Sequence, residues 1–265
     1  PALCDNGQRA ALSLPDGTRR IKDKDGKELH HFAGVAVMAE YATLPRENVI
    51  KIDKSIPLDK AALVGCAVMT GVGAAINTAK VDPGSTVAVL GAGGIGLNVI
   101  QGAALAGARQ IIAIDMADHK LDFAKKFGAT DVVNPSRDGD AVMKVMAMTG
   151  GGADYAFECI GIGTTVAQAY NMARKGGTTV VVGVSKPTDT VTLGTFMMPF
   201  QEKTLIGSMY GSARPSTDFP RLLNLYKDKR LKLDELVTAV YGIDDVNRAF
   251  EDMQSGANAR GIIVF

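Results

Sequence analysis

The sequence predicts an α/β protein whose main unit is a doubly wound parallel sheet. Three observations lead to this fold class. Short apolar segments alternate with helical patterns between about residues 86 and 184, as in strands that are buried on both faces and joined by helices. A glycine-rich segment with the spacing G-x-G-x-x-G follows the first of these strands, and an aspartate follows the second. Because such crossovers are right-handed, we expect helices on both faces of the sheet.

The region before the sheet is predicted to be a loop-rich β region. Asp-Gly pairs at 16–17 and 25–26 are typical of turns. Small and β-favouring residues predict a strand within 32–43, and the apolar alternation at 49–52 predicts another.

A helical pattern follows at 58–79, although it contains Gly65, Gly71 and Gly73. Each glycine weakens a helix by roughly 1 kcal/mol relative to alanine. The three glycines therefore indicate that another backbone approaches this helix closely.

From residue 86 onward the pattern is regular. The expected strands are 86–90, 110–114, 131–133, 155–159 and 178–184, and the expected helices are 96–106, 117–127, 141–149 and 165–174. After about residue 210 the alternation fades, and we expect helices at 219–229 and 246–254 and strands at 236–240 and 262–265. A dinucleotide-binding domain is thus expected at 67–211, with 1–66 and 212–265 packing together as a second, incomplete domain.

Composition excludes several classes of protein. The 265 residues are 46% hydrophobic and 22% charged, which argues against disorder, collagen and a coiled coil. Lys and Arg number 29 against 28 Asp and Glu, so no basic stripe for nucleic acid is present. Apolar runs such as 87–90 and 180–182 are too short to span a bilayer. The sequence has three cysteines without a C-x-x-C pair and no secretory pattern, which favours a reducing, cytoplasmic location. We therefore expect neither nucleic-acid nor membrane partners.

The segment from Gly91 to Gly96 has the residues that a diphosphate-binding turn needs. Gly91 permits the tight turn, Gly93 lets the backbone approach a pyrophosphate, and Gly96 allows the helix to press against the strand. Gly94 and Ile95 lie between them, where the first helical N–H groups and the helix dipole face the phosphates.

Asp115 follows the second buried strand, 115 − 96 = 19 residues beyond the last glycine of the turn. A carboxylate at this place is expected to accept the ribose hydroxyls of a dinucleotide. It would repel a 2′-phosphate, and Met116 offers no positive charge, so NAD is favoured over NADP. The alternative is that Asp115 only caps the helix that begins near residue 117.

Five segments together carry a resemblance to a known family: 30–34 (HHFAG), 63–71 (LVGCAVMTG), 89–96 (VLGAGGIG), 151–155 (GGADY) and 255–260 (SGANAR). Over essentially its whole length the chain resembles a zinc-containing alcohol dehydrogenase of the medium-chain dehydrogenase/reductase superfamily. The likeness leans toward the class III, S-(hydroxymethyl)glutathione dehydrogenase-like branch. The resemblance implies a Rossmann sheet flanked by remnants of a GroES-like β-rich catalytic domain.

The resemblance also implies an activity. Members are oxidoreductases that transfer a hydride from a zinc-bound primary or secondary alcohol, or a hydroxymethyl-thiol adduct, to NAD, which gives an aldehyde or ketone. They assemble as homodimers or homotetramers through the edge of the Rossmann sheet, for which 190–193 and 205–209 are the candidates here.

Site residues follow from the same resemblance. Cys66 resembles the downstream thiolate of the catalytic zinc, and Thr70 resembles a threonine packed near the nicotinamide. Cys4 resembles the last of the four structural-zinc thiolates, and Phe32 and Ala33 match positions that shape the substrate pocket. The further cofactor contacts implied are Lys120 to the adenosine ribose, Val182 and Val184 to the nicotinamide pocket, the backbone of Met209 and Tyr210 to the carboxamide, and Arg260 to the pyrophosphate.

Each assignment has a simpler alternative. Cys66 and the strand valines could be ordinary core residues, Thr70 a plain helix residue, Lys120 a solvated lysine and Cys4 an exposed terminal cysteine. Cys159 is expected in the core, and the three histidines are interpreted as surface or satisfied core residues.

The chain also departs from the family. No upstream Cys-His pair accompanies Cys66, and one thiolate does not hold zinc at useful affinity. We therefore expect a truncated dehydrogenase that binds NAD and turns over little, with zinc in the full-length parent. The alternatives are a non-catalytic NAD-binding module and a zinc-free, quinone-reductase-like member of the superfamily; Cys66 favours the dehydrogenase.

Overall fold

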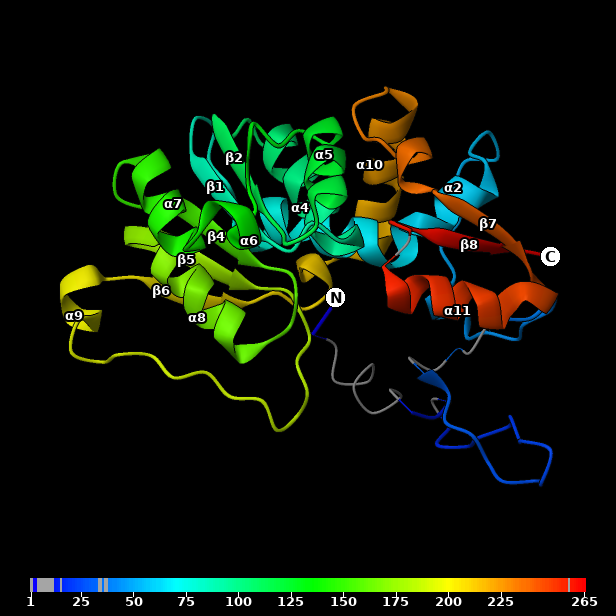
Figure 1. The fold of residues 1–265 in the computed structure, drawn as a ribbon. Helices are drawn as coiled ribbons and strands as arrows, with labels where there is room; N and C mark the ends of the chain where they lie inside the picture. Colours follow the sequence, from blue (N-terminus) through cyan, green and yellow to red (C-terminus); the bar gives the residue numbers. More distant parts are fainter. Residues whose placement is uncertain (1, 4–11, 15, 33–34, 36–37, 257) are drawn as a thin grey trace.

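The fold centres on a six-stranded sheet in which every neighbouring pair is parallel (Figure 1). The computed structural model describes residues 2–3, 12–14, 16–32, 35, 38–256 and 258–265. The strand order is β3-β2-β1-β4-β5-β6. The strands are β1 (Thr86–Leu90), β2 (Gln110–Ile114), β3 (Asp131–Val133), β4 (Ala153–Glu158), β5 (Ala173–Val181) and β6 (Thr204–Gly207). The predicted α/β class with a parallel sheet is confirmed.

Strand β1 shows why the sheet is covered on both faces. All five of its residues are buried. Because side chains alternate along a strand, Val87 and Val89 join one apolar cluster, whereas Ala88 and Leu90 join another. The first face is covered by α4 (Gly94–Leu105) and α5 (Asp118–Lys126), and the second by α7 (Ala141–Thr149) and α8 (Gly163–Met172). The expectation of helices on both faces is therefore confirmed.

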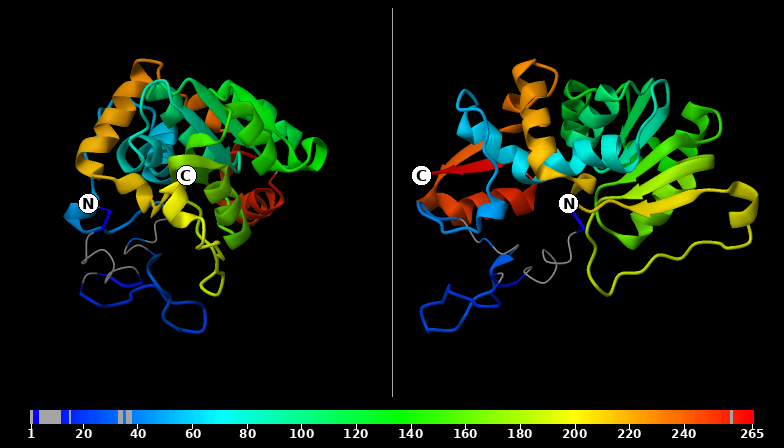
Figure 2. Two further views of the ribbon diagram at one scale, coloured as in Figure 1. Left: turned by 90° about the vertical axis from the view of Figure 1, so that its left-hand side faces the viewer. Right: turned by 180° about the vertical axis from the view of Figure 1, so that it is seen from behind.

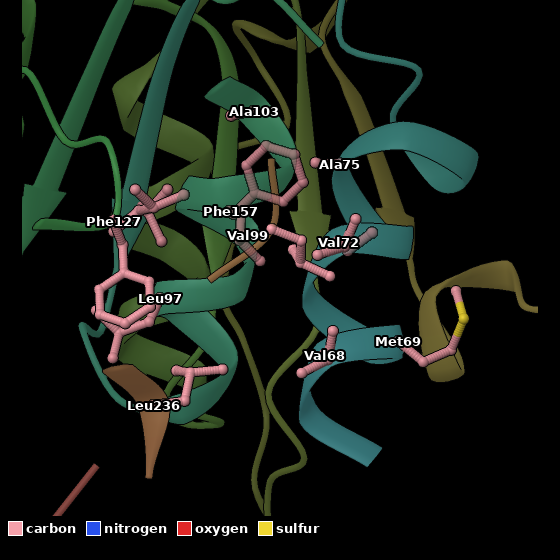
Figure 3. Packing of buried hydrophobic residues seen from close by; sticks show 14 of the residues in the cluster. Val68, Met69, Val72, Ala75, Leu97, Val99, Ala103, Phe127, Phe157 and Leu236 are labelled. Carbon is pink, nitrogen blue, oxygen red and sulfur yellow. The ribbon is translucent and has the colours of Figure 1, made fainter. Parts of the chain in front are cut away.

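The glycine-containing segment forms one helical run, Leu58–Thr78, that packs on α4. It consists of α2 (Leu58–Leu63), a π turn η3 (Val64–Val68), α3 (Met69–Gly73) and a second π turn η4 (Ala74–Thr78). Figure 3 shows that Val68 and Val72 point towards α4, whereas Met69 points away from it. Most of the run's buried side chains belong to the larger of the two apolar clusters.

By length and composition alone, the same run is long and apolar enough to cross a membrane. This differs from our expectation that every apolar stretch is too short. Its 21 residues have a mean hydropathy of 1.6 in the most apolar window, and 61% of that window is buried inside the protein. Sequence inspection missed it because the contributing apolar residues are interrupted by glycines and small residues. Its packing explains its composition, since a core helix must be apolar on most sides.

The C-terminal part adds a small sheet beside the large one. It contains α10 (Pro215–Lys227), β7 (Ala239–Gly242), α11 (Val246–Ser255) and β8 (Gly261–Val264), and β7 and β8 pair in parallel. In Figures 1 and 2, α10 stands between the two sheets. The shorter helical elements are η2 (Arg46–Asn48), α6 (Pro135–Asp138), α9 (Met198–Gln201), η5 (Tyr210–Ser212), η6 (Asp234–Leu236) and η7 (Ile243–Asp245).

Several expected strands differ in the structure. In the described part of the segment before residue 58, the only strand-like pairing is the isolated bridge between Lys22 and Glu28, and the strands expected at 32–43 and 49–52 are absent from its described residues. A strand needs a hydrogen-bonded partner, and β-propensity alone does not supply one. The edge strand expected at 190–193 is also irregular. The turns at Gly17 and Gly26 are confirmed, because both glycines have a φ of +80°.

Candidate functional site: a glycine turn facing a buried arginine

The turn after β1 has the geometry that its glycines predict. Gly91 has a φ of +92° and donates its N–H to the carbonyl of Ile114 at 2.8 Å. A Cβ on Gly96 would overlap the carbonyl oxygen of Gly91, so only glycine lets α4 start so close to the turn. A Cβ on Gly93 would meet nothing within 4 Å. The backbone at Gly93 is therefore open to a ligand.

Helix α4 begins at Gly94 without a side-chain cap. The N–H groups of a first helical turn have no partners within the helix, and together with the helix dipole they attract an anion. The predicted residues Gly91, Gly93, Gly94, Ile95 and Gly96 thus form one turn at the carboxyl edge of the sheet, and anion binding there stays a prediction.

Asp115 ties this turn to the segment that leads into α5. Its Oδ2 accepts the N–H of Ala92 at 2.9 Å, and its Oδ1 accepts the N–H of Ala117 at 3.0 Å. The bond to Ala117, the residue just before α5, agrees in part with the alternative that Asp115 caps this helix. Each carboxylate oxygen has a further lone pair, so the two bonds leave room for a ribose hydroxyl, and that role stays a prediction.

A cavity of about 650 Å³ opens between the glycine turn, α5 and the C-terminal segment. It is lined by Ala92, Gly93, Gly94, Ile95, His119, Lys120, Phe123, Cys159, Ile160, Thr238, Met253, Gly256, Asn258, Ala259 and Arg260. The turn, Lys120 and Arg260 were each assigned to the cofactor from sequence, and the structure brings them together here.

Arg260 lies directly against the turn. A Cβ on Gly94 would stand 2.5 Å from its Nε, and this Nε is buried without a hydrogen-bond partner among the described residues. Burial lowers the pKa of the Arg260 guanidinium. A guanidinium facing the positive end of a helix is unfavourable unless an anion lies between them. The planar donor fork suits a diphosphate, so the residues of this site fit a dinucleotide.

Glu158 organises the neighbouring loop, and the sequence analysis did not assign it. Its side chain is fully buried, and Oε1 accepts the N–H groups of Ile160 and Gly161 at 2.8 and 2.7 Å and the hydroxyl of Thr165 at 2.8 Å. Its Oε2 has no partner in the described part of the chain. The sequence signal that could have marked Glu158 is a single acidic residue within a mostly apolar strand.

Cys159 follows Glu158 and has two neighbourhoods. It packs against the core cluster, as expected, and it also lines the cavity. Burial, and after it the nearby Glu158, raises the pKa of the Cys159 thiol. Cys159 therefore forms part of the cavity wall, and its burial disfavours the reactive thiolate form.

The remaining sequence-predicted residues lie outside the lining of this cavity. Cys66 is exposed on η3 and Thr70 is partly buried on α3. Val182 is buried, so the core alternative applies to its side chain, whereas Val184 is 92% exposed. Phe32 is also exposed, and Ala33 and Cys4 lie outside the described residues.

Met209 and Tyr210 form the start of the turn η5. Met209 is exposed, and the hydroxyl of Tyr210 donates to the carbonyl of Gly65 at 2.7 Å. Burial, with a smaller contribution from Cys66, raises the pKa of Tyr210 to about 12. This contact places the η5 turn beside the helix that carries Cys66.

Of the three histidines, His119 alone lines the cavity. His119 is exposed at the cavity, and His31 is buried with its Nε2 accepting the N–H of Arg20 at 3.0 Å. The lining residues that the sequence analysis missed are His119, Phe123, Ile160, Thr238, Met253, Gly256, Asn258 and Ala259, with Ala92 from the turn itself. Gly256, Asn258 and Ala259 lie in the SGANAR segment of the family resemblance, whereas only three-dimensional proximity marks the others.

A metal site requires more donors than the described residues supply. Within the part of the chain that the structure describes, no three His, Cys, Asp or Glu side chains are grouped so that they could hold a metal ion. Zinc sites use three or four protein ligands, and Cys66 is a single thiol. The described residues alone therefore do not fit a zinc ion, and no chemical step through zinc is derived from them.

Comparison with known proteins places the chain in a family. The model of the zinc-binding dehydrogenases matches residues 94–228. "Alcohol dehydrogenase-like 5" of Arabidopsis thaliana is 40% identical over 249 residues, which cover 93% of this chain and 64% of that protein. "Alcohol dehydrogenase class-3" of Cereibacter sphaeroides is 38% identical over 260 residues, which cover 95% of this chain and 69% of that protein. The chain thus spans about two thirds of the length of these relatives.

Solved structures agree. The "Alcohol dehydrogenase zinc-binding domain protein" from Burkholderia ambifaria superposes with a TM-score of 0.90 at 32% identity. The superposition covers 99% of this chain and 74% of that one. Benzyl alcohol dehydrogenase from Acinetobacter calcoaceticus gives 0.87 at 30% identity, with the same coverage. A dehydrogenase from Sinorhizobium meliloti bound to NADP gives 0.78 at 26% identity, over 100% of this chain and 74% of that one. The resemblance seen in the sequence is confirmed: this chain belongs to the zinc-binding dehydrogenase family.

Proposed function

We propose that this chain is the cofactor-binding part of an NAD-dependent alcohol dehydrogenase. One observation carries the proposal. The buried guanidinium of Arg260 has an Nε without a partner among the described residues, and it faces the uncapped start of α4. A diphosphate bound beside them in the cavity would accept hydrogen bonds from both groups at once.

The chain's own residues divide the cofactor between two regions. The glycine turn and Arg260 hold the diphosphate, and Asp115 and Lys120 hold the adenosine ribose. Thr70, Val182, Val184 and the backbone of Met209 and Tyr210 would then receive the nicotinamide ring. When bound, the nicotinamide accepts a hydride from the carbon of an alcohol.

Asp115 supports NAD rather than NADP. Its carboxylate is fixed by the N–H groups of Ala92 and Ala117, so it cannot swing away from the ribose. A 2′-phosphate brought to this place would meet a negative charge at short range. NADP in the Sinorhizobium meliloti neighbour belongs to a chain only 26% identical to this one.

The substrate we propose is a primary or secondary alcohol, or a hydroxymethyl-thiol adduct as in the class III branch. The names of the relatives support an alcohol. Exposed Cys66 would serve as one ligand of a zinc ion whose other ligands are not among the described residues. Phe32 and Ala33 remain proposed pocket residues.

We further propose that two copies of the chain pair through β6. This strand forms the edge of the large sheet, so one side of its backbone is unpaired. Exposed apolar side chains accompany it, namely Phe196, Met197, Phe200 and Leu205. They support a homodimer, or a homotetramer built from two such pairs.

Calorimetry with NADH and NADPH tests the cofactor assignment. Asp115→Asn should weaken NADH binding by about tenfold or more, because hydrogen bonds to a charged acceptor contribute ~1.5–3 kcal/mol each. Asp122→Asn is the matched control, since it removes the same charge from an exposed site on α5. Equal NADH affinity in the Asp115→Asn protein would refute the ribose role, and NADPH binding as tight as NADH would refute the preference for NAD.

A further inference from the structure

We propose that the hydroxyl of Tyr210 is a positioning group that couples the nicotinamide side of the site to Cys66. The inference rests on the proposed function and goes beyond it. The resemblance gives only the backbone of Tyr210 a role, whereas the structure gives its side chain a partner on another element.

The turn that carries Tyr210 is strained. Tyr210, Gly211 and Ser212 have consecutive positive φ angles of 52°, 63° and 50°. Only glycine adopts this region without penalty, so two of the three residues are held there by their surroundings. A backbone in this conformation needs external contacts to keep its shape.

Those contacts come from the helical run Leu58–Thr78. The Nδ2 of Asn77 donates to the carbonyl of Gly211 at 3.2 Å. The hydroxyl of Thr78 lies 2.9 Å from that of Ser208 and 2.7 Å from that of Ser212. These three hydrogen bonds hold the turn and the preceding Ser208 against the C-terminal end of the helical run.

The Tyr210 hydroxyl fastens the turn at the other end of the run. It donates to the carbonyl of Gly65, which lies in the π turn η3 immediately before Cys66. Among the described residues this is the only side-chain hydrogen bond to η3. π turns inside α-helices are rare and are frequently found at functional sites.

The thiol of Cys66 has no hydrogen-bond partner among the described residues, and the residue is exposed. The backbone of η3 therefore fixes the direction of the Cα–Cβ bond of Cys66, about which the thiol rotates among its rotamers. Because Tyr210 joins that backbone to the η5 turn, a nicotinamide resting on η5 would be coupled through this hydrogen bond to the segment that carries Cys66. Tyr210 thus positions the thiol relative to the nicotinamide without touching the reacting atoms.

The test compares Tyr210→Phe with Tyr226→Phe in the 265-residue chain. Both substitutions remove one hydroxyl from a partly buried tyrosine, and Tyr226, on α10, donates to Asp234 in η6 and makes no hydrogen bond to η3 or η5 among the described residues. Two probes are titrated by calorimetry: NADH, which reaches η5, and ADP-ribose, which lacks the nicotinamide. Alkylation of Cys66 by iodoacetamide is followed by peptide mass spectrometry, with Cys159 as the internal reference.

Tyr210→Phe should bind NADH about three- to tenfold more weakly, because the η5 turn loses its tie to η3 and a smaller fraction of the protein holds both in the binding arrangement. Its ADP-ribose affinity should match that of the unsubstituted chain, and Cys66 should be alkylated several-fold faster. Tyr226→Phe should leave all three quantities unchanged.

Other outcomes overturn the inference in distinguishable ways. Unchanged NADH affinity and alkylation in Tyr210→Phe would remove the positioning role and leave the proposed function standing. An equal loss of NADH and ADP-ribose affinity would show that Tyr210 only supports the fold. If the unsubstituted chain bound neither probe, the proposed function would fail, and this inference would fail with it.

Discussion

Two aspartates at opposite ends of the parallel strands show what a single residue can reveal. Asp115 lies at the carboxyl edge and bonds the glycine turn, and its place was predicted from its spacing to Gly96. Asp154 lies at the start of β4, where its Oδ2 accepts the N–H and the hydroxyl of Thr86 at 2.7 and 2.8 Å. Asp154 lies in the GGADY segment that carries the family resemblance, but its structural role was not predicted, because its partners are 68 and 20 residues away along the chain.

Asp154 predicts a pH dependence of stability. Burial acts to raise its pKa, but hydrogen bonds from Thr86 and Arg174 outweigh burial and hold the pKa below its usual 3.8. A carboxylate with a lowered pKa stabilises the fold above pH 3.8, and this contribution is lost as the pH falls through the lowered value. Asp154→Asn should therefore reduce the free energy of unfolding by about 1–2 kcal/mol at pH 7, after allowance for the partly exposed Arg174.

Urea unfolding of the two proteins at pH 7 and near pH 3 measures this difference. The gap between Asp154→Asn and the unsubstituted chain should narrow at the lower pH. Asp122→Asn, on an exposed surface, provides the baseline for removing a charge. A gap of the same size at both pH values would contradict the electrostatic account.

At the scale of elements, periodicity predicted the strands of the buried sheet well and the edges of the fold poorly. Each predicted strand between 86 and 184 overlaps a strand of the structure, because burial on both faces leaves a continuous apolar run. The strand expected at 236–240 begins instead at Ala239, since Leu236 is buried in the short helix η6. The π turns in Leu58–Thr78 have no sequence signature at all. The division into domains at 66 and 211 stays a prediction.

The glycines of that helical run were predicted to mark close backbone approach, and two of the three do. A Cβ on Gly71 would stand 2.5 Å from the Cβ of Asn98 on α4, and a Cβ on Gly73 would stand 2.5 Å from the carbonyl oxygen of Gly211. A Cβ on Gly65 would meet nothing within 4 Å, so at that position the prediction was wrong.

Gly71→Ala should therefore destabilise the fold, whereas Gly65→Ala should not. Overpacking at Gly71 should lower the free energy of unfolding by about 1–3 kcal/mol, because α3 and α4 must move apart. Alanine at Gly65 should be neutral or raise it by up to ~1 kcal/mol through helix propensity. Thermal and urea unfolding of both variants provide the measurement, and equal effects would show that the contact between α3 and α4 yields without cost.

For the whole molecule, the site depends on how distant segments meet. The glycine turn comes from β1, Asp115 follows β2, Glu158 ends β4, and Arg260 arrives just before β8. The rule that ligands bind at the carboxyl edge of a parallel sheet predicts the first two. It does not predict Arg260, because the path of the C-terminal segment depends on packing around α10, and the family resemblance supplied that residue instead.

The free edge of the large sheet leads to the last prediction, about assembly. An unpaired strand with apolar neighbours either aggregates or pairs with a second copy. If two β6 strands pair, light scattering after size exclusion should give the mass of two chains at tens of micromolar concentration. Leu205→Lys should shift the protein towards the mass of one chain, because a lysine on an edge strand opposes pairing. Val240→Lys places the same charge on an exposed position of the small sheet and should leave the mass unchanged. A chain that is monomeric at these concentrations, or a Leu205→Lys protein that remains paired, would exclude β6 as the interface.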